Sequence, residues 1–155
     1  MRIRSSAGKV ASVLIVVLSL LVTIPVAYAG DADGLAATLS SGDRADADKA
    51  RDAMRKPAEV VTFLGVASGM TVIDLIAASG YYTEVLSVAV GEKGKVYAQN
   101  GAFVLKMREG ANEKAITERL AGNRLPNVER LNREMTELGL AAGSVDVAFT
   151  ALNFH

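Results

Sequence analysis

The sequence contains no cysteine and a single histidine, His155, which is also its last residue. Without cysteine the chain cannot form a disulfide, a thiolate nucleophile or a zinc–thiolate site. One histidine at a chain end cannot form a metal site alone, so no metal site is predicted. Neither charge sign is in excess, because 17 basic residues balance 17 acidic ones. Thiol-dependent, disulfide-stapled and zinc–thiolate proteins are therefore excluded.

The first 29 residues have the pattern of an export signal. Three basic residues precede an uncharged apolar run at residues 10–24, and Ala27-Tyr28-Ala29 supplies small residues before Gly30. This pattern predicts a signal peptide at residues 1–29, cleaved to give a periplasmic or secreted protein. The alternative is an uncleaved inner-membrane anchor at residues 10–29, because about 20 uncharged residues can span a bilayer.

Cleavage would also change the charge of the chain. The signal holds three of the 17 basic residues and none of the 17 acidic ones, so the mature net charge would be −3. A net negative charge argues against nucleic acid or an anionic membrane surface as a partner. Contact with a membrane is then expected only through an uncleaved signal.

The rest of the chain divides into a short lead-in and one domain. Residues 30–42 are small and polar, and we predict a flexible lead-in there, followed by a domain at residues 43–155. Apolar residues at helix-like spacing predict a helix over residues 43–64, interrupted at Pro57. The charged residues between Arg44 and Arg55 are expected to form a solvated helix face.

Short apolar segments alternate with helical ones through the remainder. Strands are predicted at residues 71–76, 95–99, 128–132 and 145–152, and helices at residues 82–90 and 103–124, with a weak point at Gly110. Strands that alternate with helices indicate a parallel α/β sheet with right-handed crossovers.

A candidate ligand site follows the first predicted strand. Asp74 lies near the end of that strand, and small residues up to Gly80 lead into the next helix. Ligands of open α/β sheets bind at the carboxyl ends of strands, where a helix N-terminus offers free N–H groups. Ile76 and Ala78 stand where glycines would strengthen this fingerprint. The alternative is an ordinary strand–turn–helix with a buried or capping aspartate.

Several longer motifs extend this pattern. They are RDAMRKPAE at residues 51–59, FLGV at 63–66, GMTVIDL at 69–75, SGYYTE at 79–84, GKVYAQN at 94–100, GSVD at 143–146 and LNFH at 152–155. In this order they resemble a bacterial family of exported, predicted class I methyltransferases, over about residues 44–155. The resemblance implies a Rossmann-like α/β fold, the cofactor S-adenosylmethionine (SAM), and methyl transfer to an unknown, small-molecule acceptor.

The resemblance also implies where the cofactor would lie. Asp74 matches the acid that holds the methionine and ribose end of the cofactor. Ala77, Ala78 and Gly80 match the loop that packs under it. No catalytic residue is predicted, because methyl transfer depends mainly on in-line positioning of donor and acceptor.

Further cofactor contacts are implied after the next two strands. Gln99 and Asn100 stand where a carboxylate usually contacts the ribose hydroxyls, and they can hydrogen-bond through their amide groups. Glu134 lies near the position that contacts adenine. Residues 153–155 lie where the family's next motif faces the substrate.

The resemblance implies seven strands in the order 3-2-1-4-5-7-6, whereas this sequence supplies about four. The predicted strand at residues 145–152 would then be an apolar edge, through which the chain could self-associate. We therefore expect a truncated or frameshifted gene product. Two functional alternatives to the methyltransferase stay open: a non-catalytic exported α/β ligand-binding domain and an inactive truncated product.

Overall fold

The structure is a computed structural model that describes residues 31–153. The predicted signal and its cleavage site lie outside the described residues, as does His155, so export stays a prediction. Within residues 31–153, no helix is both long enough and apolar enough to cross a membrane.

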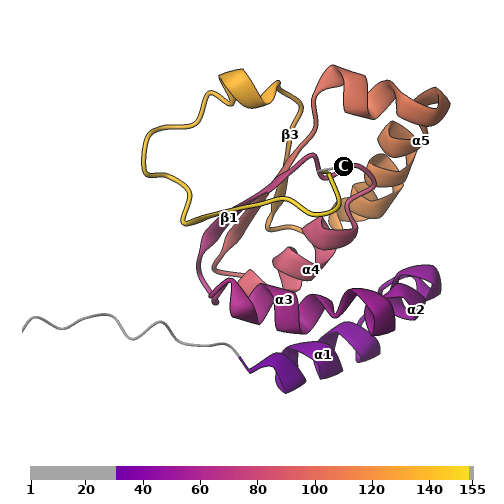
Figure 1. Cartoon of the computed structure of the whole chain (residues 1–155), viewed down its shortest axis with the longest axis vertical. Coiled ribbons are helices and arrows are strands. Elements are labelled where there is room, and N and C mark those ends of the chain that lie inside the picture. Colours follow the sequence, from indigo (N-terminus) through magenta and orange to yellow (C-terminus); the bar gives the residue numbers. More distant parts are fainter. Residues whose placement is uncertain (1–30, 154–155) are drawn as a thin grey trace, which may run out of the picture.

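In the part of the chain that the structure describes, four parallel strands form one sheet in the order β3-β2-β1-β4 (Figure 1). They are β1 (Thr71–Leu75), β2 (Lys95–Gln99), β3 (Val128–Leu131) and β4 (Val147–Phe149). All three neighbouring pairs are parallel. The predicted parallel α/β sheet is confirmed, and its order is the 3-2-1-4 portion of the order that the resemblance implies.

Within the described residues, five α-helices and two short 3₁₀ helices accompany the sheet. They are α1 (Ala32–Ser41), α2 (Asp46–Arg55), α3 (Pro57–Phe63), α4 (Tyr81–Val90), α5 (Ala102–Leu120), η1 (Ala121–Asn123) and η2 (Met135–Glu137). The predicted break at Pro57 is confirmed, because Lys56 takes a left-handed conformation between α2 and α3. Helix α4 packs on β1 and β2, and α1 and α3 pack on α4.

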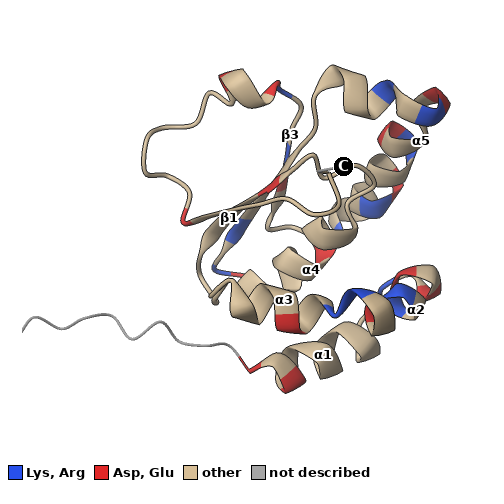
Figure 2. Cartoon of the chain, in the orientation of Figure 1, with Lys and Arg blue, Asp and Glu red and all other residues tan. Residues whose placement is uncertain are grey.

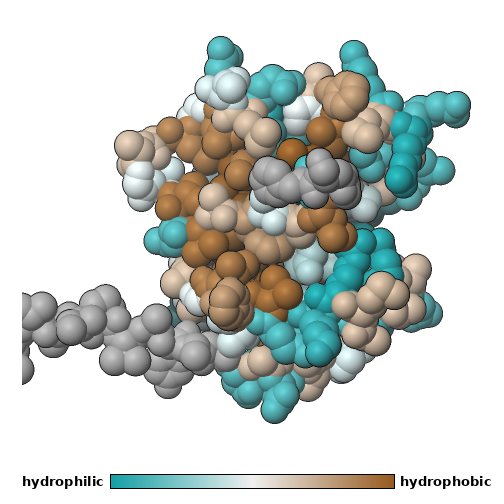
Figure 3. All heavy atoms as spheres, viewed as in Figure 1, coloured by the Kyte–Doolittle hydropathy of each residue, from teal (hydrophilic) through white to brown (hydrophobic). Residues whose placement is uncertain are grey.

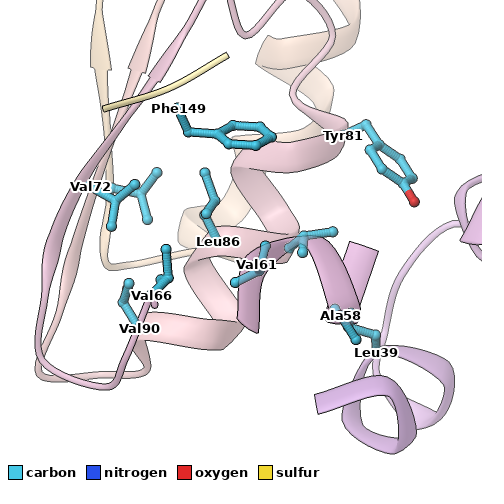
Figure 4. Packing of buried hydrophobic residues seen from close by; sticks show 11 residues of the cluster. Leu39, Ala58, Val61, Val66, Val72, Tyr81, Leu86, Val90 and Phe149 are labelled. Atoms are coloured by element: carbon cyan, nitrogen blue, oxygen red, sulfur yellow. The ribbon is translucent and has the colours of Figure 1, made fainter. Parts of the chain in front are cut away.

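One apolar core joins the N-terminal helices to the sheet (Figure 4). Leu39 of α1, Val61 of α3 and Leu86 of α4 are 1% exposed or less, and they belong to one cluster with Val72 of β1 and Phe149 of β4. Full burial of an aliphatic side chain of this size contributes about 1.5–3 kcal/mol. The core therefore anchors the N-terminal helices to α4 and the sheet.

The predicted flexible lead-in at residues 30–42 is wrong for most of its length, because α1 occupies residues 32–41. The side chain of Asp31 accepts a hydrogen bond from the backbone N–H of Asp33 and so caps the first turn. Leu35 and Leu39 lie one turn apart and pack into the core. Two leucines among small and polar residues suffice for a helix because tertiary packing holds them.

Helix α5 lies beside the same sheet but is not continuous. Ile116 packs against Ala77 and Ala98, which form a second small cluster. Residues 107–110 have non-helical backbone angles, so the helix kinks there. The predicted weak point at Gly110 is confirmed, and the kink turns the first part of α5 toward the carboxyl end of β1.

Strand β4 spans residues 147–149, and the prediction of a strand over residues 145–152 is therefore too long. The side chain of Asp146 accepts a hydrogen bond from the N–H of Thr71 just before the strand, and Leu152 has a positive φ of 61° after it. β4 is an edge of the sheet. Hydrophobic residues gather over β4 and α3 on the face seen in Figure 3.

Candidate functional site

The chain turns sharply after β1. Ile76 and Ala78 have positive φ angles of 56° and 51°. These are the two positions where glycines would strengthen the ligand-binding fingerprint, and a β-branched residue with positive φ is an outlier. The left-handed conformation costs a residue with a Cβ roughly 1–2 kcal/mol. The loop thus keeps the shape of a glycine-rich turn without the glycines, and its surroundings must hold it there.

Two buried amides hold this loop. Gln99 and Asn100, at the end of β2, are each 1% exposed. The Gln99 Oε1 accepts from the N–H of Ile76 at 3.0 Å, and its Nε2 donates to the carbonyl of Arg133 at 2.6 Å. The Asn100 Oδ1 accepts from the N–H of Ala78 at 2.8 Å, and its Nδ2 donates to the carbonyl of Ala78 at 3.2 Å. Both residues support the loop; their contact with ribose stays a prediction.

Replacing Ala78 with glycine is expected to stabilise the fold. The change removes the left-handed strain of a Cβ, keeps both backbone hydrogen bonds to Asn100, and should raise the free energy of unfolding by about 0.5–1 kcal/mol in urea titrations. Ala77→Gly is the matched control. Ala77 has no positive φ and is 9% exposed, so glycine there should destabilise. If both variants change the free energy of unfolding in the same direction, the proposed strain at Ala78 is contradicted.

Asp74 lies at the carboxyl end of β1 and is 3% exposed. Its Oδ2 accepts a hydrogen bond from the hydroxyl of Thr83 at 2.7 Å, and the backbone N–H of Thr83 also bonds the carboxylate. Burial raises the pKa of Asp74 to about 7, against the opposing effect of these two hydrogen bonds. The residue caps the first turn of α4, and a carboxylate has capacity for further hydrogen bonds.

A cavity of about 580 Å³ opens at this end of β1. It is lined by Arg51, Arg55, Asp74, Ile76, Ala77, Ala78, Ser79, Tyr81, Tyr82, Phe103, Val104, Met107, Arg108, Asn112, Ala151, Leu152 and Asn153. Such a volume lies within the usual range for small-molecule sites, roughly 300–1,000 Å³. Strand β1, the loop after it, α2, α4, the first part of α5 and the residues after β4 all contribute walls.

The cavity residues that come from α2, Arg51 and Arg55, are both basic. Figure 2 shows basic and acidic residues together along α2. The guanidinium carbons of Arg51 and Arg55 lie 4.9 and 4.6 Å from the ring centroid of Tyr81. The prediction of a solvated face over this helix is wrong in part. Arg44 is 6% exposed and Asp48 is 3% exposed, because both take part in a buried ion network.

This ion network fixes Tyr81 between α2 and α4. Arg44 pairs with Asp52 at 2.6 Å, and the hydroxyl of Tyr81 donates to the same carboxylate at 2.6 Å. Burial raises the pKa of Tyr81, and the neighbouring Asp52 raises it further. Tyr81 is therefore a neutral hydrogen-bond donor, and its ring is held as a fixed platform under the arginines.

The structure brings three of the seven predicted site residues to the cavity: Asp74, Ala77 and Ala78. Gly80 faces α5 instead. Its φ is 81°, and a Cβ there would lie 2.4 Å from Ile116 Cδ1, so glycine allows the helix to approach.

The Glu134 carboxylate accepts from the N–H of Ala102 at 3.0 Å and caps the first turn of α5. Its predicted contact with adenine stays a prediction.

Sequence reasoning missed Arg51 and Arg55 as residues of the site. The sequence did hold a signal for them: Arg51 and Arg55 lie one helical turn apart, and two like charges at this spacing destabilise a helix. Asn153, which the resemblance places toward the substrate, does line the cavity. Its side chain donates to the hydroxyl of Thr150 at 2.8 Å.

No protein-family model and no curated protein sequence matches the chain. Solved structures do match the chain. A SAM-dependent methyltransferase from Aquifex aeolicus is similar at 30% identity and a TM-score of 0.54, covering 78% of this chain and 56% of its own. A SAM-dependent O-methyltransferase from Thermotoga maritima is similar at 30% identity and a TM-score of 0.49, covering 62% of this chain and 34% of its own.

This chain thus spans a little over half the length of the Aquifex aeolicus protein that it matches. Over that part, both have a parallel α/β sheet with flanking helices. The expectation from the sequence motifs is confirmed at the level of the fold. The chain has a Rossmann-like α/β fold of the kind found in class I SAM-dependent methyltransferases.

Proposed function

We propose that this chain is part of a SAM-dependent methyltransferase that binds its cofactor in the cavity at the carboxyl end of β1. The observation that carries the proposal is this cavity, which is lined by Asp74 and by the loop that contains the left-handed residues Ile76 and Ala78. The fold is shared with a SAM-dependent methyltransferase at 30% identity. Open α/β sheets bind ligands at this edge of the sheet.

The residues present fit such a cofactor. The carboxylate of Asp74 can accept hydrogen bonds from ammonium or hydroxyl groups in addition to those of Thr83. Ala77 and Ala78 let a ligand approach the backbone of the loop, which Gln99 and Asn100 hold from behind. Phe103 and Met107 add apolar surface on the α5 side of the cavity.

Bound SAM would supply a methyl group on a positively charged sulfur. Asp74 and the backbone of the loop at residues 76–79 would hold the cofactor, and Phe103 and Met107 would lie along its α5 side. The cavity walls then need only hold donor and acceptor in line, so the proposed reaction requires no dedicated acid or base.

We also propose a small-molecule acceptor and a location outside the cytosol. The cavity volume supports the first. The basic and apolar pattern of residues 1–29 supports the second. Self-association through the edge strand β4 is a further proposal, supported by the apolar groove that Val60, Phe63 and Phe149 line there.

Calorimetric titration with SAM and with S-adenosylhomocysteine (SAH) tests the proposed function. Saturable binding of both is expected. Asp74→Asn should weaken SAH binding at pH 8 about tenfold, because charge-assisted hydrogen bonds are about twice as strong as neutral ones. Asp146→Asn is the matched control at the opposite end of β1 and should leave binding unchanged. An absence of heat at high micromolar ligand would refute the proposal for this chain.

A further inference from the structure

The two α2 residues among the described lining of the cavity are both basic. Arg51 and Arg55 lie one helical turn apart, and both line the cavity. Arg51 is paired with Asp48. Within residues 31–153, no carboxylate oxygen lies within 4.0 Å of the guanidinium nitrogens of Arg55 or of Arg108, which lines the α5 side of the same cavity.

The cavity offers these arginines little internal counter-charge. Asp74 is the one carboxylate among the described lining residues, and Thr83 already occupies part of it. Like charges at this helical spacing destabilise a helix by about 0.2–0.5 kcal/mol. A concave, cation-lined surface raises the local concentration of anions.

The arginines are also fixed in position. The guanidinium groups of Arg51 and Arg55 stack over the ring of Tyr81, whose hydroxyl is bound to Asp52. Stacking on an aromatic face holds a guanidinium by cation–π attraction and leaves its N–H groups free to point elsewhere. Less conformational freedom is then lost when those N–H groups bind an anion.

We propose that Arg55, together with Arg51, forms a subsite for an anionic group of the methyl acceptor, a carboxylate or a phosphate. The inference rests on the proposed methyltransferase function and adds the chemical class of the acceptor. A guanidinium fork matches the planar oxygens of a carboxylate, or two oxygens of a phosphate, with two parallel hydrogen bonds. The subsite lies on the α2 side of the cavity, across from the first part of α5.

The same chemistry has a second source, the carboxylate of the cofactor itself. The experiment must therefore separate an acceptor subsite from a cofactor contact. Phenyl phosphate, benzoate and the neutral benzamide are titrated into the chain by calorimetry in phosphate-free buffer, each with and without saturating SAH.

Phenyl phosphate and benzoate are expected to bind at least tenfold more tightly than benzamide, with or without SAH. Arg55→Gln should weaken the binding of both anions at least tenfold. Lys93→Gln makes the same change in net charge at the opposite, amino-terminal edge of β2 and should change binding less than twofold. Arg55→Lys should restore only part of the affinity, because lysine keeps the charge and loses the fork.

The outcomes distinguish this inference from the function on which it rests. Equal binding of benzamide and benzoate, or equal losses in Arg55→Gln and Lys93→Gln, would overturn the subsite. Displacement of the anions by SAH would also overturn it, because the arginines would then hold the cofactor. If SAH gives no heat while the anions bind through Arg55, the methyltransferase proposal fails and the anion subsite stands.

Discussion

Replacing Glu84 with alanine is expected to lower the free energy of unfolding by about 3–5 kcal/mol, because it removes a buried carboxylate that pairs with two partly buried arginines. Glu84 on α4 is 1% exposed. Its carboxylate pairs with Arg119 of α5 and with Arg124 just after η1. Arg119 also pairs with Asp48 of α2 at 2.7 Å. Glu84 therefore joins α4 to α5, and Arg119 extends this link to α2; all three helices carry walls of the cavity.

The matched control is the surface pair of Glu113 and Arg130, at 2.7 Å, whose side chains are 46% and 26% exposed. Glu113→Ala should cost less than about 1 kcal/mol, because solvent screens an exposed ion pair and the freed arginine is rehydrated. Urea unfolding of both variants measures the difference. Equal losses for Glu84→Ala and Glu113→Ala would show that the buried network does not hold the helices together.

The sheet could be predicted from the sequence because each buried parallel strand is a short apolar run between breakers. The predicted bounds of β2 agree with the structure, since glycine precedes the strand and a polar pair ends it. Helix α1 could not be predicted in this way. Its two leucines are a weak periodic signal, and the surface against which they pack comes from α3 and α4.

The position of the site could be predicted as well, because Asp74 ends a buried strand that leads into a helix. The roles of Gln99 and Asn100 could not. Their partners, Ile76 and Ala78, lie 22 or 23 residues earlier in the chain, and only the parallel pairing of β1 with β2 brings them together.

The buried charges of α2 were missed for a related reason. Periodicity identifies a polar helix face, but it does not say whether water or another helix covers that face. The partner that buries Asp48 is Arg119, which is 71 positions away in the sequence. A polar helix face that pairs with another helix and one that is covered by water have the same sequence pattern. Only the tertiary contacts distinguish them.

Asp74→Asn is expected to stabilise the fold at pH 8 while it weakens ligand binding. The folded pKa of about 7 lies above the ordinary aspartate value of 3.8, so between about pH 4 and pH 7 the folded state binds more protons than the unfolded state. The stability of the unsubstituted chain should therefore fall as pH rises through this window and level off above it. Asparagine removes the charge and keeps an oxygen that can accept from Thr83.

The expected gain for Asp74→Asn is about 2–4 kcal/mol at pH 8, shrinking toward zero near pH 4, because one pKa unit corresponds to about 1.4 kcal/mol. Urea titrations from pH 4 to pH 8 measure it as a difference between the two proteins, so that contributions from other carboxylates cancel. Asp146→Asn, at the exposed amino end of β1, should stay within about 0.5 kcal/mol at every pH.

The sign of this difference in the free energy of unfolding shows whether the Asp74 carboxylate stabilises the fold or serves the ligand. If Asp74→Asn is less stable than the unsubstituted chain at pH 8, the carboxylate is a net stabilising cap of α4, and a structural role suffices to explain it. If the variant is more stable but binds SAH about tenfold more weakly, the fold bears the cost of a buried charge that serves the ligand. Because burial opposes ionisation and only Thr83 supports it, we expect the second result.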